Sequence, residues 1–194
     1  MFSFFFGQEE INDKLSVKKC EEQVEKCVIH NKWIQKAIQF LTECSNKIED
    51  ISSESKKIIN CKFCEPSLFP HSRAYYRIDE KKIYLCANRL SINDVFVVLK
   101  HELTHFIDDK LGFDFLVPEI VACSEIRAAK NAECEHAIFK KKCTKKFAYD
   151  SIKFKYPNQS HEIIERIFDK CYNSKIFLKD NISFLSSFGF NNFK

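Results

Sequence analysis

Ten cysteines constrain the fold of this 194-residue chain more than any other feature of its sequence. They are spread over most of the chain, as Cys20, Cys27, Cys44, Cys61, Cys64, Cys86, Cys123, Cys134, Cys143 and Cys171. A reducing compartment would leave them as core residues or metal ligands, whereas an oxidising one permits disulfides whose pairing the sequence does not give. We favour oxidation, because ten cysteines exceed what packing requires and few have zinc-ribbon spacing.

The Cys61-x2-Cys64 pair has three interpretations: half of a structural zinc site, a redox pair, or two members of different disulfides. The sequence holds no second C-x2-C to complete a zinc ribbon. The nearby Pro66 and Pro70 argue against the strand-to-helix position of a thioredoxin-like pair. Structural disulfides are therefore the default prediction.

The composition is that of a soluble globular protein with one domain, at 45% hydrophobic and 30% charged residues. The net charge of +4 arises from 31 basic and 27 acidic residues mixed along the chain, so we expect no nucleic-acid binding. The lysine runs Lys140–Lys142 and Lys145–Lys146 are interpreted as solvated helix faces. The apolar start, Met1–Gly7, lacks the basic flank of a secretory signal, and no stretch reaches the length of a membrane span.

Hydrophobic periodicity predicts an α+β fold that is mainly helical, with a small sheet. Residues 12–50 are expected to form a pair of helices, and residues 60–80 an irregular segment. A short strand follows at Lys82–Cys86, and a further helix begins at the N-cap Ser160 and runs through Cys171. The Phe- and Asn-rich residues 176–194 are interpreted as a tail packed on the body.

The best-marked helix is predicted over residues 92–110. Ser91 is a plausible N-cap with Asp94 three residues on, as in a capping box, and Gly112 stands where a left-handed C-cap glycine belongs. A second long helix is expected to start near Pro118, a favourable first-turn residue, and to run to about residue 142.

The predicted helix over residues 92–110 carries an H-E-x-x-H motif formed by His101, Glu102 and His105. Histidines four residues apart lie on one helical face and can bind one Zn²⁺ ion. Glu102 lies about 100° around the helix, so its carboxylate can act as general base on a zinc-activated water without being a ligand. The alternative is two polar residues on a solvated face.

A catalytic zinc site needs a third protein ligand. The metzincin extension of the motif is missing, because Asp108 and Leu111 occupy the positions of its glycine and third histidine. We favour Glu125 on the next helix, with Asp108 or Asp109 as the alternative. An acid that does not bind zinc is expected to orient a ligand histidine or to pair with Arg127. His136 or His161 is a further candidate for an electrophile in the cleft.

Several sequence blocks, in order along the chain, carry a resemblance to a known family. They are Phe2-Ser3-Phe4-Phe5-Phe6, Cys61-Lys62-Phe63-Cys64, Ile83-Tyr84-Leu85-Cys86-Ala87-Asn88, His101-Glu102-Leu103-Thr104-His105-Phe106-Ile107-Asp108-Asp109, Ala122-Cys123-Ser124-Glu125-Ile126-Arg127-Ala128-Ala129 and Phe168-Asp169-Lys170-Cys171-Tyr172. Together they resemble the mitochondrial inner-membrane metalloproteases that process and help assemble the ATP synthase. The chain departs from that family at Asn131-Ala132-Glu133, which replaces a small turn containing Ser or Gly.

The resemblance implies a zincin-like, disulfide-stapled metalloprotease domain over residues 1–194, with its catalytic core in residues 82–175. It implies a protein of the mitochondrial intermembrane space, peripherally attached to the inner membrane, with Zn²⁺ as cofactor. Its expected substrate is the precursor of an ATP synthase membrane subunit.

Two other functions remain open: an assembly factor or chaperone for the ATP synthase with a mainly structural zinc, and a cytosolic zinc protein with free thiols. For an endopeptidase, we expect the substrate to pair as an extended strand along a sheet edge near Ile83–Leu85.

Overall fold

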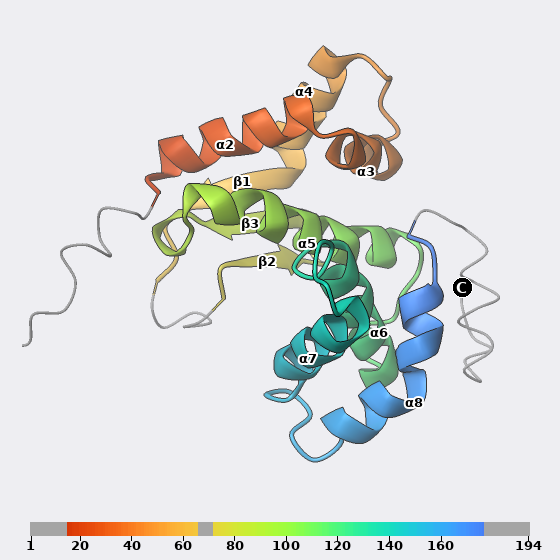
Figure 1. The fold of residues 1–194 in the computed structure, drawn as a ribbon. Helices are drawn as coiled ribbons and strands as arrows, with labels where there is room; N and C mark the ends of the chain where they lie inside the picture. The colour runs from red at the N-terminus through yellow and green to blue at the C-terminus, as the bar shows by residue number, and fades with distance from the viewer. Residues whose placement is uncertain (1–14, 66–71, 177–194) are drawn as a thin grey trace, which may run out of the picture.

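The helix α5 (Ile92–Lys110) runs through the middle of the molecule and packs against elements on both of its sides (Figure 1). The computed structural model describes residues 15–65 and 72–176. The predicted capping box is present, since the Ser91 backbone N–H donates to Asp94 Oδ2 at 3.1 Å. Gly112 follows the helix with a φ of +88°, the left-handed conformation that favours glycine.

All three strands among the described elements lie in the first half of the chain, and the second half is helical. In chain order the other described elements are α2 (Val17–His30), α3 (Lys32–Thr42), α4 (Ile48–Ile58), β1 (Ile59–Lys62), β2 (Ala74–Arg77), β3 (Lys82–Cys86), the 3-10 turn η1 (Ala87–Arg89), α6 (Pro118–Asn131), α7 (Lys140–Ile152) and α8 (Ser160–Asn173). This is the predicted class: a mainly helical α+β domain with a small sheet.

The sheet has three strands in the order β1-β3-β2. Its central strand, β3, pairs in parallel with β1 and antiparallel with β2, so that Ile83 lies opposite Ile59 on one side and Tyr76 on the other. Ile83 and Leu85 are fully buried. The expectation of an open edge near Ile83–Leu85 is therefore wrong, because β3 is paired on both sides; the edge that contacts α5 is β2.

The helices form two groups, one on each side of α5. In Figure 1, α2, α3 and α4 lie beyond the sheet, while α6, α7 and α8 lie on the opposite side. Apolar side chains such as Ile34 and Ile38 of α3 and Ile120 of α6 are fully buried against this central helix and its neighbours. The packing fixes α5 from both sides, and with it the residues of the H-E-x-x-H motif.

The observed elements differ from the sequence expectations in two respects. Helices at 17–30 and 32–42 match the predicted N-terminal pair, but the short elements α4, β1 and β2 were not predicted. The helix expected from Pro118 to about residue 142 is two helices, and the prediction of one is wrong. The break begins at Ala132, which leaves the helical conformation with φ −112° and ψ −93°, next to the disulfide-bonded Cys134.

Eight of the cysteines form disulfides: Cys20–Cys61, Cys64–Cys86, Cys123–Cys171 and Cys134–Cys143. Cys61 and Cys64 belong to different bonds, as predicted. Cys27 and Cys44 are not disulfide-bonded. The four bonds join α2 to β1, the segment after β1 to the end of β3, α6 to α8, and the α6–α7 connection to α7.

The Phe-rich segment of residues 2–6 lies outside the described residues, as does the expected tail of residues 176–194 apart from Ile176. Within residues 15–65 and 72–176, none of the helices combines the length and apolarity that a bilayer crossing requires.

Candidate metal centre

Three side chains from two neighbouring helices converge on one point beside α5. His101 Nε2 lies 3.5 Å from Glu125 Oε2, and His105 Nε2 lies 3.5 Å from Glu125 Oε1. The two histidines are one turn apart on α5, with ring centroids 4.8 Å apart, while Glu125 comes from α6. One donor atom from each residue lies within 4.8 Å of the other two.

The second nitrogen of each ring is held by another residue, which turns both Nε2 atoms toward Glu125. His101 Nδ1 lies 3.1 Å from Glu133 Oε2, and His105 Nδ1 lies 2.7 Å from Ser124 Oγ. Outer partners of this kind fix the orientation and tautomer of metal-binding imidazoles. Neither partner is predicted as a member of the site from the residue pattern alone. The only sequence feature that points to Glu133 as a partner of the site is its position, two residues beyond the end of α6.

The donor set fits a divalent metal ion. Ligands at 2.0–2.1 Å from a tetrahedral ion lie ~3.4 Å from one another. Each histidine Nε2 lies 3.5 Å from one of the two Glu125 oxygens, and one donor atom from each of the three residues lies within 4.8 Å of the other two. Glu125 Oε2 is also a buried oxygen without a hydrogen-bond partner. A buried carboxylate oxygen of this kind is costly unless it is paired or coordinates a cation, so an ion at this point would satisfy it.

The charges of the three residues in the triad shift one another's pKa values. Burial lowers the pKa of His105 to about 4. Burial also acts to lower the pKa of His101, but the adjacent carboxylates of Glu125 and Glu133 outweigh this and raise the pKa well above the ordinary value. Although burial acts to raise the pKa of Glu125, the two histidines lower it to about 2. The carboxylate is therefore ionised at neutral pH, as a metal ligand must be.

Glu102 lies in the same cleft without joining the converging donors. Its residue is only 8% exposed, and burial raises its pKa to about 7, although the neighbouring His101 and the Tyr76 backbone act in the opposite direction. A carboxylate with a pKa near 7 is suited to accept and return a proton at neutral pH.

The alternative ligands Asp108 and Asp109 are engaged elsewhere. Asp108 Oδ1 lies 2.8 Å from Arg127 Nη2 in a fully buried ion pair. Asp109 accepts hydrogen bonds from the Tyr76 hydroxyl and the Lys81 ammonium. The structure thus brings Glu125, rather than either aspartate, to the histidines, and pairs Asp108 with Arg127.

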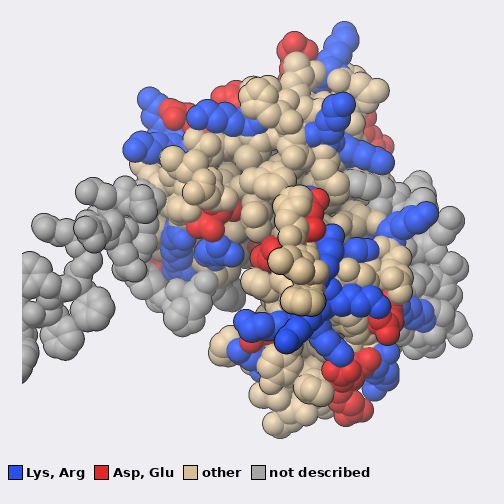
Figure 2. Space-filling view, in the orientation of Figure 1, with Lys and Arg blue, Asp and Glu red and all other residues tan. Residues whose placement is uncertain are grey.

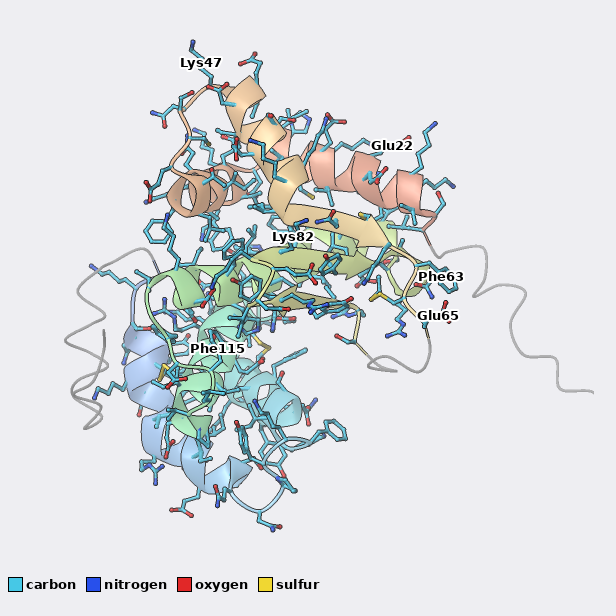
Figure 3. All side chains as sticks on the ribbon, turned by 180° about the vertical axis from the view of Figure 1, so that it is seen from behind. Glu22, Lys47, Phe63, Glu65, Lys82 and Phe115 are labelled. Carbon is cyan, nitrogen blue, oxygen red and sulfur yellow. A yellow bond between two sulfur atoms is a disulfide. The ribbon has the colours of Figure 1, made fainter. Side chains whose placement is uncertain are left out.

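The triad opens into a cleft of about 710 Å³ between β2 and the end of α7. Its lining comprises Ser72, Ala74, Tyr75, Tyr76, Ile78, His101, Glu102, His105, Phe115, Val121, Glu125, Asp150, Ser151 and Phe154. Phe115, labelled in Figure 3, lies edge-on to His105 with ring centroids 6.3 Å apart. His136 and His161 are exposed and do not line this cleft, so the proposed electrophile is not found at either position.

The site combines a candidate metal-binding triad with a buried glutamate beside it. The sequence model of the Peptidase M76 family matches residues 18–176. The chain therefore belongs to the Peptidase M76 family, which confirms the family inferred from the sequence blocks. No curated protein and no solved structure matches the chain.

Proposed function

We propose that this chain is a zinc-dependent endopeptidase whose ion is held by His101, His105 and Glu125. The observation that carries the proposal is the convergence of these three side chains, with Glu102 buried beside them. Two imidazoles and one carboxylate are the ligand set of several zinc peptidases, in which the remaining coordination position stays open. Membership of a peptidase family supports the same chemistry.

Glu102 acts as the proton carrier in the proposed reaction. When bound, zinc supplies Lewis-acid polarisation of the scissile carbonyl and lowers the pKa of water toward about 7. Glu102 accepts a proton from the attacking water and then donates it to the leaving amine. Glu102 is only 8% exposed and lies in the same cleft as the triad, where its carboxylate can carry out both steps.

The open edge of β2 is the proposed binding place for the substrate backbone. Ala74, Tyr75 and Tyr76 of this strand line the cleft, opposite the end of α7. An extended peptide that adds to this edge forms main-chain hydrogen bonds and passes in front of the triad. Phe115 and Val121 provide an apolar wall for one substrate side chain.

The experiment compares cleavage of a protein or peptide substrate by the oxidised wild-type chain, by the same chain after chelation and zinc restoration, and by Glu102→Gln. We expect chelation to abolish cleavage, zinc to restore it, and the variant to lose at least about 1,000-fold in rate as a missing general base and proton carrier predicts. Glu162→Gln, an exposed glutamate on α8, serves as a charge-matched control. Cleavage that persists in Glu102→Gln contradicts the proposal.

We further propose that the substrate is the precursor of ATP synthase subunit a, from which the N-terminal prosequence is removed in the mitochondrial intermembrane space. The support is the family membership together with four disulfides, which are typical of an oxidising compartment. Cells depleted of the protein should accumulate the precursor, and wild type but not Glu102→Gln should restore processing. If Glu102→Gln restores synthase assembly without processing, the second proposed role, as an assembly factor, is supported.

A further inference from the structure

The positive charge of the chain is concentrated on one segment, residues 140–155. This segment contains seven lysines and one acidic residue, Asp150, and so carries +6, whereas the whole chain carries +4. The rest of the chain is therefore slightly negative. Figure 2 shows blue Lys and Arg side chains gathered over the position of α7.

Large apolar side chains stand exposed at both ends of this basic helix. Ile138 is 93% exposed and Phe139 75% exposed just before α7, and Phe154 is 82% exposed just after it. We call residues 138–155 the basic–aromatic face. Large apolar side chains exposed to water beside a charged helix are typical of an interaction surface and are not needed for solubility.

The acidic residues around the face neutralise only part of its charge. From α8, Asp169 pairs with Lys141 at 3.0 Å and Glu165 pairs with Lys145 at 2.6 Å. Asp150 is shared between Lys146 and Lys153. Among the described residues, Lys140, Lys142 and Lys155 have no carboxylate within ion-pair distance.

A shallow groove of about 240 Å³ lies between α7 and α8 within this face. Lys142, Lys145 and Lys146 line it together with Tyr149, His161, Ile164 and Glu165, and the Glu165 carboxylate pairs with Lys145. Three lysines and one glutamate leave this groove with a net positive charge, which matches the phosphate of a lipid headgroup, and Tyr149 offers a hydroxyl to it.

We propose that the basic–aromatic face docks on a bilayer that contains anionic phospholipids. The lysines would neutralise headgroup phosphates while Ile138, Phe139 and Phe154 insert at the boundary between headgroups and acyl chains. Charge complementarity alone would also suit an acidic protein. The exposed apolar side chains at both ends of the helix favour the bilayer, because they provide the second signal that stable peripheral binding requires.

Docking in this way would place the catalytic cleft at the bilayer surface. Phe154 belongs both to the face and to the cleft lining, as do Asp150 and Ser151. A polypeptide segment that emerges from the bilayer would therefore meet β2 and the triad directly. This consequence depends on the proposed peptidase function, whereas the docking itself does not.

The test is flotation of the full-length oxidised chain with vesicles of phosphatidylcholine, with and without phosphatidylserine. We expect binding only to the anionic vesicles, weakened by salt. Reversal of two lysines, in the double variant Lys142→Glu and Lys146→Glu, should reduce vesicle affinity by roughly thirtyfold or more, at ~1 kcal/mol lost per lysine. The replacements Ile138→Ser and Phe139→Ser should weaken binding at high salt, where the apolar contribution dominates.

The matched control is the double variant Lys18→Glu and Lys19→Glu, which replaces two exposed lysines of α2. It changes the net charge by the same amount as the α7 double variant. If this pair weakens binding as much as the α7 pair, or if the wild type ignores anionic vesicles, the proposal is wrong. Binding to polyglutamate but not to vesicles would assign the face to an acidic protein and also overturn it. Glu102→Gln should bind vesicles like the wild type, so a failure of the peptidase proposal remains distinguishable.

Discussion

Asp108 and Arg127 form an ion pair at 2.8 Å, with side chains that are 0% and 1% exposed. Arg127 also donates to Ser174 Oγ at 2.8 Å and to the backbone carbonyl of Lys175. The pair thus links α5, α6 and the chain beyond α8. Burial raises the pKa of Asp108, although the charge of Arg127 acts to lower it.

Asp108→Ala should destabilise the fold strongly, because it leaves the Arg127 guanidinium buried without its partner. Loss of one member of a buried pair costs about 3–5 kcal/mol. The measurement is urea unfolding of the oxidised protein at neutral pH. Asp169→Ala, which breaks the exposed pair with Lys141, is the control and should cost at most about 1 kcal/mol. Equal losses in the two variants would show that burial of the Asp108 pair has no energetic role.

Glu133→Gln should weaken metal binding without changing the fold. The glutamate accepts from His101 Nδ1 and lies outside the triad, and removal of such an outer partner typically costs 10–100-fold in metal affinity. Competition of the purified chain with a zinc-binding dye measures the change, and circular dichroism of the metal-free variant checks the fold. Glu162→Gln should retain wild-type affinity. A wild-type affinity in Glu133→Gln would show that this contact does not position the ring.

The centre of the site could be predicted from the sequence, whereas its outer partners could not. The i, i+4 spacing of His101 and His105 on a capped helix depends only on local geometry, which the sequence specifies. Ser124 and Glu133 reach the rings only because α6 packs against α5 and then ends at Ala132. Such contacts depend on tertiary packing, and no local pattern encodes them.

The small strands illustrate the same limit. β1 and β2 have four residues each, too few for a clear alternation of apolar and polar side chains, and β2 mixes tyrosines with Arg77. β3 was recognisable because it alternates around the buried Ile83 and Leu85. That strand was then wrongly expected to be an edge, since strand order depends on pairing between distant segments.

A thiol count tests the arrangement of the cysteines. Eight are disulfide-bonded, and Cys27 and Cys44 are free. The denatured, unreduced protein should therefore release two reactive thiols per chain, and the reduced protein all ten. Mass spectrometry after alkylation should place both labels on Cys27 and Cys44. Ten reactive thiols without reductant would refute the oxidised fold and favour the cytosolic alternative.

The capping box of α5 should make stability depend on pH in the acid range. Burial acts to raise the pKa of Asp94, but hydrogen bonds from Ser91 and the nearby Arg73 lower it below its ordinary value of 3.8. Since the folded-state pKa is the lower one, the ionised group stabilises the fold at pH values above 3.8, and this contribution is lost as the pH falls below it.

Asp94→Asn should therefore destabilise the protein at pH 7 by about 0.5–1 kcal/mol, at the lower end for helix caps because the side chain is partly exposed. Urea unfolding of both proteins at pH 7 and near pH 3 measures the difference, which should shrink at the lower pH. A difference that is equal at both pH values would contradict the role of the ionised carboxylate.

The most direct test of the central claim is zinc X-ray absorption of the oxidised protein, combined with elemental analysis. We expect one zinc per chain in wild type and in Glu102→Gln, with nitrogen and oxygen neighbours at about 2.0–2.1 Å and the scattering signature of two imidazoles. His105→Ala and Glu125→Ala should lose most of the metal. Sulfur neighbours at about 2.3 Å, or full zinc occupancy in both alanine variants, would show that cysteines rather than His101, His105 and Glu125 hold the ion.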